Sequence, residues 1–176
     1  ASRVKGRRPG RRMSPHTIDI QIEEPYQSAV QTETLRQAAD ATLGHQQVDE
    51  PSELVVVISG DEALHELNRR HRGVDAPTDV LAFPHKTKSP SSLPFAFVDA
   101  PGFPRYLGDV VISLPRARTQ AEEAGNTLQA ELQLLVVHGV LHLLGYDDQT
   151  GHERAQMWQA QKAILDRMGV DVHLPD

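Results

Sequence analysis

Two histidines four residues apart, His138 and His142, are the side chains of this sequence best spaced to do chemistry together. They lie in a run from Leu134 to Leu144 that is apolar on every side, which predicts a buried helix. Side chains four apart on a helix share one face about 6 Å from each other, where two imidazoles can bind one metal ion. Either ring alone is explained equally well as a core histidine with one hydrogen bond. Two on one buried face are harder to satisfy separately, so the spacing favours a metal site.

A third ligand has to come from the residues that follow this helix. Gly145 predicts a turn, and Asp147, Asp148 and His152 come after it. The sequence contains no cysteine, so the ligands available are imidazoles and carboxylates. Three protein ligands leave a position open for water, which is the catalytic arrangement for zinc. Metal-bound water can reach a pKa of about 7, which suits attack at a carbonyl or at phosphorus, or activation of a ribose hydroxyl.

Gly139 distinguishes this pattern from that of the HExxH metalloproteases, which place a glutamate base directly after the first histidine. Glycine inside a helix costs about 1 kcal/mol relative to alanine, so we expect another segment of backbone to approach the helix closely at this residue. The absence of the glutamate argues against protease chemistry. A metal hydrolase that acts on peptides is kept as the alternative.

The elements that must position the site are predicted from hydrophobic periodicity and from capping residues. Strands are expected over residues 17–22, 53–58, 78–83 and 108–113. Helices are expected over residues 28–43 and 61–71, from Pro115 to Gly125, from a cap at Asn126 or Thr127 to Leu144, and over residues 151–168. The predicted fold class is α/β (α+β): a central mixed sheet of about four strands packed with about five helices. The metal site is expected at the C-terminal end of the buried central helix.

The length of 176 residues suits a single domain with its own core. Residues 1–12 include six basic residues and no acidic one, which predicts a disordered tail or a remnant of cloning, with a basic RNA-contacting arm as the alternative. Residues 13–176 are expected to form one metal-hydrolase domain. No apolar run approaches the roughly 18 residues that span a bilayer, so no membrane partner is expected. The lack of cysteine fits the reducing cytoplasm, and the sequence does not indicate an oligomeric state.

The charge of the chain is unevenly distributed. Without residues 1–12 the sequence carries 12 basic and 24 acidic residues, a net charge of -12, which argues against broad binding of nucleic acid. Residues 69–118, however, hold eight basic and four acidic residues. This segment predicts either a basic face on an acidic body or charges scattered in solvent.

Three blocks of the sequence resemble those of the bacterial YbeY-type endoribonucleases, which are rRNA maturation factors. The stretch from His138 to Asp147, HGVLHLLGYD, is similar to the family's HGxLHLxGYDH motif. Leu67–Arg72 resembles its LNxxxR motif, and Pro77–Pro84, PTDVLAFP, resembles its PTDVLSFP segment. Gly108–Ser113 matches a third block, and the resemblance covers roughly residues 17–168 in the family's order.

The resemblance implies a metal-dependent hydrolase of the cytoplasm that cleaves single-stranded RNA. Its substrate would be the 16S rRNA precursor on the small ribosomal subunit, in 3′-end maturation and in ribosome quality control. His138 and His142 would hold one ion, with Zn2+ expected and other divalent metals as alternatives. Arg72 would act with metal-bound water at the scissile phosphate. As a basic residue at a helix C-terminus, Arg72 is also explained by the helix dipole.

The sequence departs from the family at the third ligand. The family's third histidine follows Tyr-Asp directly, whereas that position here is Asp148, and His152 comes four residues later. We expect Asp148 to be the third ligand, because it stands at the matching position and a carboxylate binds zinc at about 2.0 to 2.2 Å. A carboxylate ligand would also broaden the choice of metal toward iron or manganese. His152 is the alternative if the turn at residues 149–151 folds back.

Other side chains are weaker candidates for the site. Asp147, Asp79 and Asp109 could orient a ligand imidazole or accept a proton, and ordinary turn chemistry explains each of them as well. Met157 and Trp158 are expected to pack the last helix, and no aromatic platform for stacking bases is expected. The acidic body and the altered third ligand also leave open an inert ribosome-associated binding module.

Overall fold

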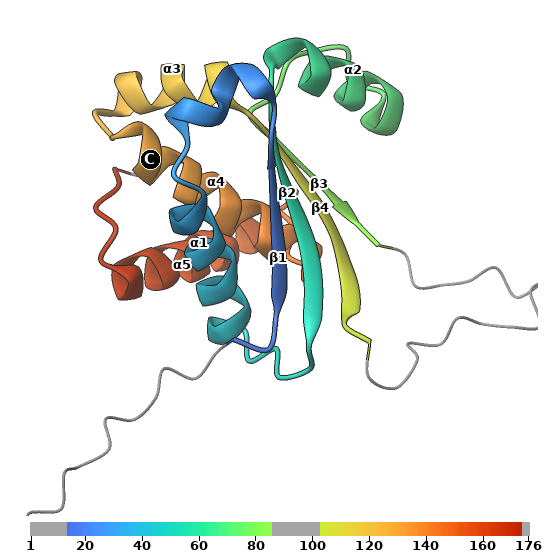
Figure 1. Ribbon diagram of the computed structural model, residues 1–176, viewed down its shortest axis with the longest axis vertical. Coiled ribbons are helices and arrows are strands. Elements are labelled where there is room, and N and C mark those ends of the chain that lie inside the picture. The colour runs from blue at the N-terminus through green and yellow to red at the C-terminus, as the bar shows by residue number, and fades with distance from the viewer. Residues whose placement is uncertain (1–13, 86–102, 174–176) are drawn as a thin grey trace, which may run out of the picture.

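The structure of the chain is a computed structural model that describes residues 14–85 and 103–173, and it contains one sheet between two layers of helices (Figure 1). The predicted tail at residues 1–12 lies outside the described residues. The strands are β1 (Thr17–Ile22), β2 (Ser52–Ser59), β3 (Val80–Pro84) and β4 (Arg105–Ser113). They lie in the order β1-β2-β4-β3, with β1, β2 and β4 parallel and β3 antiparallel to β4. The prediction of a mixed four-stranded sheet is confirmed.

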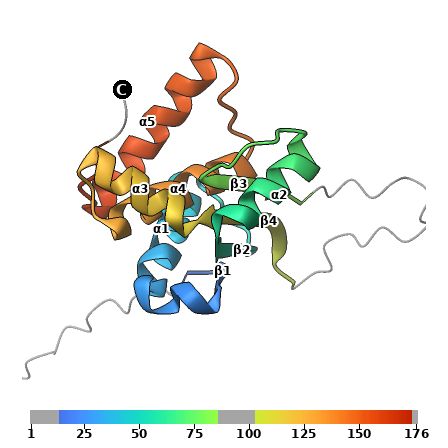
Figure 2. The same cartoon turned by 90° about the horizontal axis from the view of Figure 1, so that it is seen from above.

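Four α-helices cover one face of the sheet and a fifth covers the other (Figures 1 and 2). The first group consists of α1 (Thr32–His45), α3 (Leu114–Ala124), α4 (Leu128–Leu143) and α5 (Gly151–Met168). On the opposite face lies α2 (Asp61–Arg72), where Leu64 packs with Leu81 and Val111 of the sheet. The last residue of α2, Arg72, lies near β3, and it lines the same cavity as residues of β3 and α4.

Three predicted elements begin two or more residues away from where the structure has them. The helix expected over residues 28–43 is instead a short 3-10 helix, η1 (Glu24–Ala29), followed by α1, because Val30 between them has an extended backbone, with φ -117° and ψ 127°. Strand β3 begins at Val80 rather than at residue 78, after an aspartate whose carboxylate accepts a hydrogen bond from the Val80 amide. Strand β4 begins three residues earlier than expected, at Arg105, and its pairing with β2 continues across a register irregularity.

Helix α4 lies against the sheet at the centre of the core. Its apolar side chains contact other elements on all sides, and Leu132, Val136 and Leu141 are fully buried. A Cβ atom on Gly139 would lie 2.4 Å from Cγ1 of Val110 on β4, which explains why glycine stands here. The prediction of a close approach is confirmed, but the approaching group is a side chain and not backbone. This contact fixes the height at which both histidines sit above the sheet.

No helix within residues 14–85 and 103–173 is both long and apolar enough to cross a membrane.

Candidate metal centre

The rings of His138 and His142 face each other on the last two turns of α4. Their ring centroids are 4.6 Å apart and their Nε2 atoms 3.1 Å apart. Both side chains are partly buried, and the His142 side chain is 24% exposed. The four-residue spacing therefore brings two imidazole nitrogens to one point, as the sequence predicts.

The second nitrogen of each ring has a partner that fixes which nitrogen carries the proton. Nδ1 of His142 lies 2.8 Å from the backbone oxygen of Tyr146, and Nδ1 of His138 lies 2.6 Å from Oε1 of Gln161 on α5. Both oxygens can only accept, so each Nδ1–H donates. In the neutral rings both Nε2 atoms then carry lone pairs, and two lone pairs at 3.1 Å cannot bond to each other. A cation between them satisfies both.

The carboxylate of Asp148 offers an oxygen as the third candidate ligand beside the two nitrogens. Its Oδ2 lies 3.8 Å from Nε2 of His142, and the three ligand atoms all lie within 4.8 Å of one another. Two atoms bound tetrahedrally to one zinc ion at about 2.0 to 2.1 Å lie roughly 3.3 Å apart. The two imidazole nitrogens, at 3.1 Å, are close to this value and the Asp148 oxygen, at 3.8 Å from His142, is slightly farther, so a small movement of the carboxylate lets the donor set fit one divalent ion. Among the described residues, His138, His142 and Asp148 are the group of metal-ligating side chains that lies close enough together to hold one ion.

His152 lies outside that group, because the chain begins a new helix before this residue can return. Thr150 caps α5, its side chain accepts from the Glu153 amide, and the Glu153 carboxylate accepts from the Thr150 amide. This capping box places His152 in the first turn of α5, where it is exposed. The geometry therefore favours Asp148 over His152 as the third ligand.

The turn that carries Asp148 is held in several places. Gly145 has φ +101°, a left-handed conformation that favours glycine and ends α4. The Tyr146 amide donates to the Leu141 carbonyl, and its hydroxyl donates to Oε1 of Gln46 at the end of α1. Asp147 accepts a hydrogen bond from the Asp148 amide, which is ordinary turn chemistry. Tyr146 thus presents its carbonyl to His142 while the chain turns back toward the pair.

The electrostatic surroundings keep His138 neutral. Burial lowers the pKa of His138, and the neighbouring His142 lowers it further. The hydrogen bond to Gln161 and the nearby Asp79 and Asp148 act in the opposite direction. A neutral imidazole keeps the Nε2 lone pair that a metal ion requires.

Two cavities meet at His138. The smaller, about 450 Å³, is lined by Arg72, Asp79, both histidines, Asp147 and Asp148 together with backbone and side chains of β3. The structure thus brings Arg72 of α2 to the same space as the pair. Asp79 lines both cavities, with Oδ1 held by the Val80 amide. The predicted site residues that line the smaller cavity therefore lie around one centre: Arg72, Asp79, His138, His142, Asp147 and Asp148.

Asp109 does not join them. It follows Gly108 on β4, and the next residue, Val110, faces α4. Because successive side chains of a strand point to opposite faces, Asp109 points away from the histidines. There its carboxylate accepts a hydrogen bond from Tyr106.

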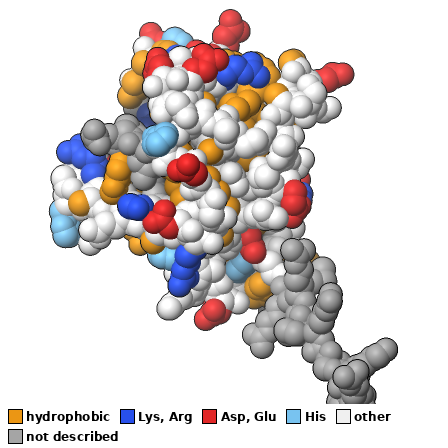
Figure 3. Space-filling view, turned by 90° about the vertical axis from the view of Figure 1, so that its left-hand side faces the viewer, with side chains coloured by type: hydrophobic (Ala, Val, Ile, Leu, Met, Phe, Trp, Pro, Cys, Tyr) orange, Lys and Arg blue, Asp and Glu red, His pale blue; other side chains and the backbone are white. Residues whose placement is uncertain are grey.

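Three of the basic residues of the segment 69–118 form ion pairs with acidic residues. Arg69 and Arg70 both pair with Glu66 on the same helix, and Arg116 pairs with Asp61. Figure 3 shows acidic and basic side chains interspersed on the face at the left of Figure 1. The ion pairs of Arg69, Arg70 and Arg116 all involve α2, so acidic side chains accompany the basic ones of the segment on this helix.

Sequence reasoning missed two residues near the pair. Gln161 is buried and bonded to His138, and Trp158 is half-buried and lines the larger cavity. The signal for Gln161 was present: it stands between Met157 and Leu165 in the apolar stripe of α5, where a polar side chain needs a buried partner. Met157 packs in the core as predicted.

Comparisons with known proteins point in one direction. The sequence profile of a family described as "Endoribonuclease YbeY" matches residues 17–169. Relatives named Endoribonuclease YbeY include one from Roseiflexus sp. (strain RS-1), 43% identical over 89% of this chain and 96% of its own length. Another from Chloroflexus aurantiacus (strain ATCC 29366 / DSM 635 / J-10-fl) is 43% identical over 88% of this chain and 97% of its own. The solution structure of TM1509 from Thermotoga maritima has a TM-score of 0.52 at 21% identity, covers 87% of this chain and 92% of that one, and shows the same fold.

Proposed function

The chain belongs to the YbeY endoribonuclease family, and from that premise we propose that it cleaves single-stranded RNA in a metal-dependent reaction centred on His138, His142 and Asp148. The observation that carries the proposal is the meeting of two imidazole Nε2 atoms and a carboxylate in a cavity that Arg72 also lines. Imidazole and carboxylate ligands with an open position suit a catalytic zinc ion, and other divalent metals are alternatives.

The side chains around the centre have different roles in the proposed reaction. A bound divalent ion supplies a Lewis acid and activates water for attack at phosphorus. Gln161 and the Tyr146 carbonyl hold the two imidazoles with Nε2 toward the ion. Arg72 binds the non-bridging oxygens of the scissile phosphate, for which the planar guanidinium fork is suited. Asp79, whose Oδ1 is held by backbone, accepts a proton at Oδ2.

We further propose a physiological setting from the family resemblance. The substrate would be the 16S rRNA precursor, cleaved at its 3′ end on the small ribosomal subunit in the cytoplasm, with a role in ribosome quality control. The similarity of the chain to relatives named endoribonucleases supports the RNA substrate. Incubating the protein with precursor 16S rRNA inside and outside the small subunit, and mapping the new 3′ ends, tests this setting.

The central experiment measures metal content and RNA cleavage on the same samples. Wild type reconstituted with Zn2+ is expected to contain about one ion per chain and to cleave end-labelled single-stranded RNA faster than duplex RNA. Arg72→Ala is expected to keep the metal and lose cleavage, with Arg72→Lys intermediate because lysine keeps the charge but not the fork. Arg70→Ala is the matched control, because Arg70 stands on the same helix, is exposed and lines neither cavity.

Several outcomes would overturn the proposal. Substoichiometric metal after reconstitution with every divalent ion tried would remove the centre. Cleavage of casein with intact RNA would favour the peptide hydrolase, although Gly139 leaves no room for the protease glutamate. Binding to the small subunit that survives His138→Ala, with no cleavage by wild type, would favour an inert binding module.

A further inference from the structure

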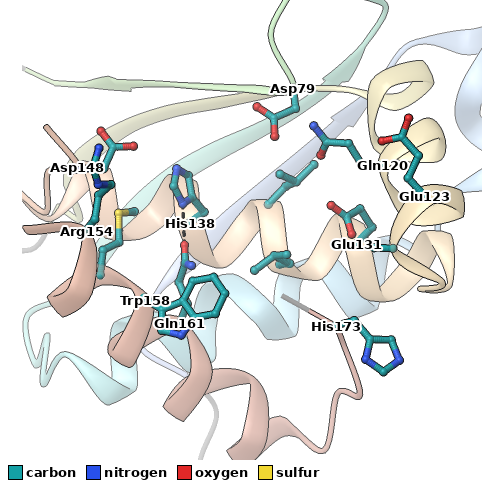
Figure 4. Close-up of a pocket in the computed structure, with 14 residues that line it drawn as sticks. Asp79, Gln120, Glu123, Glu131, His138, Asp148, Arg154, Trp158, Gln161 and His173 are labelled. Carbon is teal, nitrogen blue, oxygen red and sulfur yellow. Dashed lines mark hydrogen bonds between the residues drawn. The ribbon is translucent and has the colours of Figure 1, made fainter. Parts of the chain in front are cut away.

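The larger cavity begins where the metal centre ends. It has a volume of about 740 Å³ and shares Asp79, His138 and Asp148 with the smaller cavity that holds Arg72. Figure 4 shows that it extends from His138 along α4 toward Glu131, between α3 and α5. A volume of this size is typical of pockets for small ligands. A strand bound with its phosphate at Arg72 therefore meets a second space on the other side of the histidines.

The walls of this cavity suit a flat, largely apolar group. Leu134 and Leu135 of α4 line one side, and Met157 and Trp158 of α5 line another. The indole of Trp158 is half-buried, so one part of it packs in the protein and the rest is open to the cavity. Aromatic rings at single-strand binding sites stack on nucleobases. A nucleobase is a ligand with matching flat faces.

The far end of the cavity carries hydrogen-bond acceptors and negative charge. Glu123 and Gln120 of α3 and Glu131 of α4 line it, and the labelled side chains in Figure 4 gather there around one space. Glu131 is only 5% exposed, and Asn126 donates to its Oε2. Among the described residues no hydrogen bond to its Oε1 is found. This end of the cavity repels phosphate and attracts groups that donate hydrogen bonds.

The opposite end, beside the histidines, has the basic side chain. Arg154 lies next to Asp148, at the end of the cavity away from Glu123 and Glu131 (Figure 4). The charges thus sort the parts of a nucleotide: backbone toward Arg72 and Arg154, base edge toward Glu123 and Glu131. Carboxylates accept from exocyclic amino groups such as N4 of cytosine, and guanine and adenine also carry amino groups, whereas uracil has none.

We propose that this cavity is a nucleobase subsite that takes the base next to the scissile phosphate and favours an amino-bearing base over uracil. The proposal rests on the proposed function, because it assumes that RNA lies across the metal centre. Glu123 and Glu131 select the base edge, and Trp158 stacks on its face.

The sole tryptophan gives a direct test that does not depend on cleavage. The full chain, kept free of metal with a chelator, is titrated with short single-stranded RNAs of one length: uridine only, or with one central cytidine, adenosine or guanosine. Binding is followed by Trp158 emission and, separately, by anisotropy of labelled RNA. We expect the amino-bearing RNAs to quench the emission and to bind about tenfold more tightly than the uridine-only RNA.

Variants assign the preference to residues. Glu123→Gln and Glu131→Gln are expected to reduce the tenfold preference to near unity, and Trp158→Leu to weaken binding of all the RNAs about tenfold. Glu122→Gln is the matched control, because Glu122 precedes Glu123 on α3, is exposed and does not line the cavity. Equal affinity for all RNAs, or a preference with unchanged Trp158 emission, would overturn the subsite. Base-dependent quenching in a protein that cleaves no RNA would instead reject only the nuclease proposal.

Discussion

The helix that carries two of the ligands and the turn that carries the third differ in every property that holds a side chain in place. His138 and His142 stand on a buried helix, and each ring donates from Nδ1 to a fixed oxygen. Asp148 stands on a turn, outside any helix or strand. Its side chain is 47% exposed, and its carboxylate oxygen lies 3.8 Å from Nε2 of His142.

This difference suggests that the pair is formed before metal binds, while the carboxylate is free to adjust. A rigid pair with two converging lone pairs sets where the ion goes. An exposed oxygen on a turn can close around ions of slightly different size, which agrees with the wider metal choice expected of a carboxylate ligand.

The largest effect is expected from removing a helix-borne ligand. His138→Ala should lower metal affinity by more than about a hundredfold, since loss of mere outer partners already costs about 10- to 100-fold. Asp148→Ala should cost less, because the pair remains, and His152→Ala should leave affinity unchanged. Competition with a fluorescent chelator measures all three. Loss of metal in His152→Ala with full metal in Asp148→Ala would reverse the assignment of the third ligand.

A smaller effect is expected from the partner that orients the pair. Gln161→Leu removes the acceptor for Nδ1–H of His138 and should lower metal affinity about tenfold. Gln161→Glu keeps an acceptor at the same place and should restore the affinity. If Leu and Glu weaken metal binding equally while both variants unfold at the wild-type urea midpoint, Gln161 has no role in positioning His138.

The position of the helix itself can be disturbed at Gly139. Alanine is the better helix former by about 1 kcal/mol, but its Cβ would lie 2.4 Å from Cγ1 of a buried β-branched residue, Val110. Overpacking should prevail, so Gly139→Ala is expected to lose about 1 to 2 kcal/mol of unfolding free energy in urea. The double variant with Val110→Ala should recover part of the loss relative to Val110→Ala alone. A Gly139→Ala variant more stable than wild type would show that the strand does not press on the helix.

The same contrast explains which parts of the site could be predicted from the sequence. Helical periodicity fixes the geometry of His138 and His142, so a spacing of four residues was enough to place two imidazoles together. The four strands were predicted for a similar reason, because each is a short β-branched or alternating run between turns. Local patterns succeed where the structure they specify is itself local.

Long-range partners could not be predicted in that way. Gln161 meets His138 across 23 positions of sequence, and which face of β4 carries Asp109 depends on which side of the strand packs against α4. The start of α5 was predicted, but whether the turn at residues 149–151 brings Asp148 or His152 to the histidine pair depends on the direction in which α5 leaves that turn. Trp158 was expected to pack the last helix, and only the packing of α3, α4 and α5 reveals the cavity that it lines.

The smallest effect, on folding stability alone, is expected from replacing Glu131, which lies two turns before His138 on the same helix. Burial raises the pKa of this carboxyl group, the hydrogen bond from Asn126 partly opposes the rise, and Asp79 adds to it. The folded protein therefore holds the proton to higher pH than the unfolded chain, so folding loses stability as pH rises from the ordinary value of 4.5 through the raised one. Glu131→Gln removes this cost and should make the chelated protein more stable than wild type at neutral pH.

The pH dependence distinguishes burial from a general effect of removing a negative charge. The gain from Glu131→Gln should shrink as the pH is lowered through the raised pKa and vanish below 4.5, where the wild-type carboxyl group is neutral in both states. Urea unfolding at several pH values measures it, with Glu122→Gln as the exposed control that should show no such trend. A gain that is the same at every pH would mean that the buried helix does not penalise charge at this position. A gain that is confined to neutral pH would mean that α4 keeps an ionised acid at a cost in stability, as expected of a residue kept for binding rather than for folding.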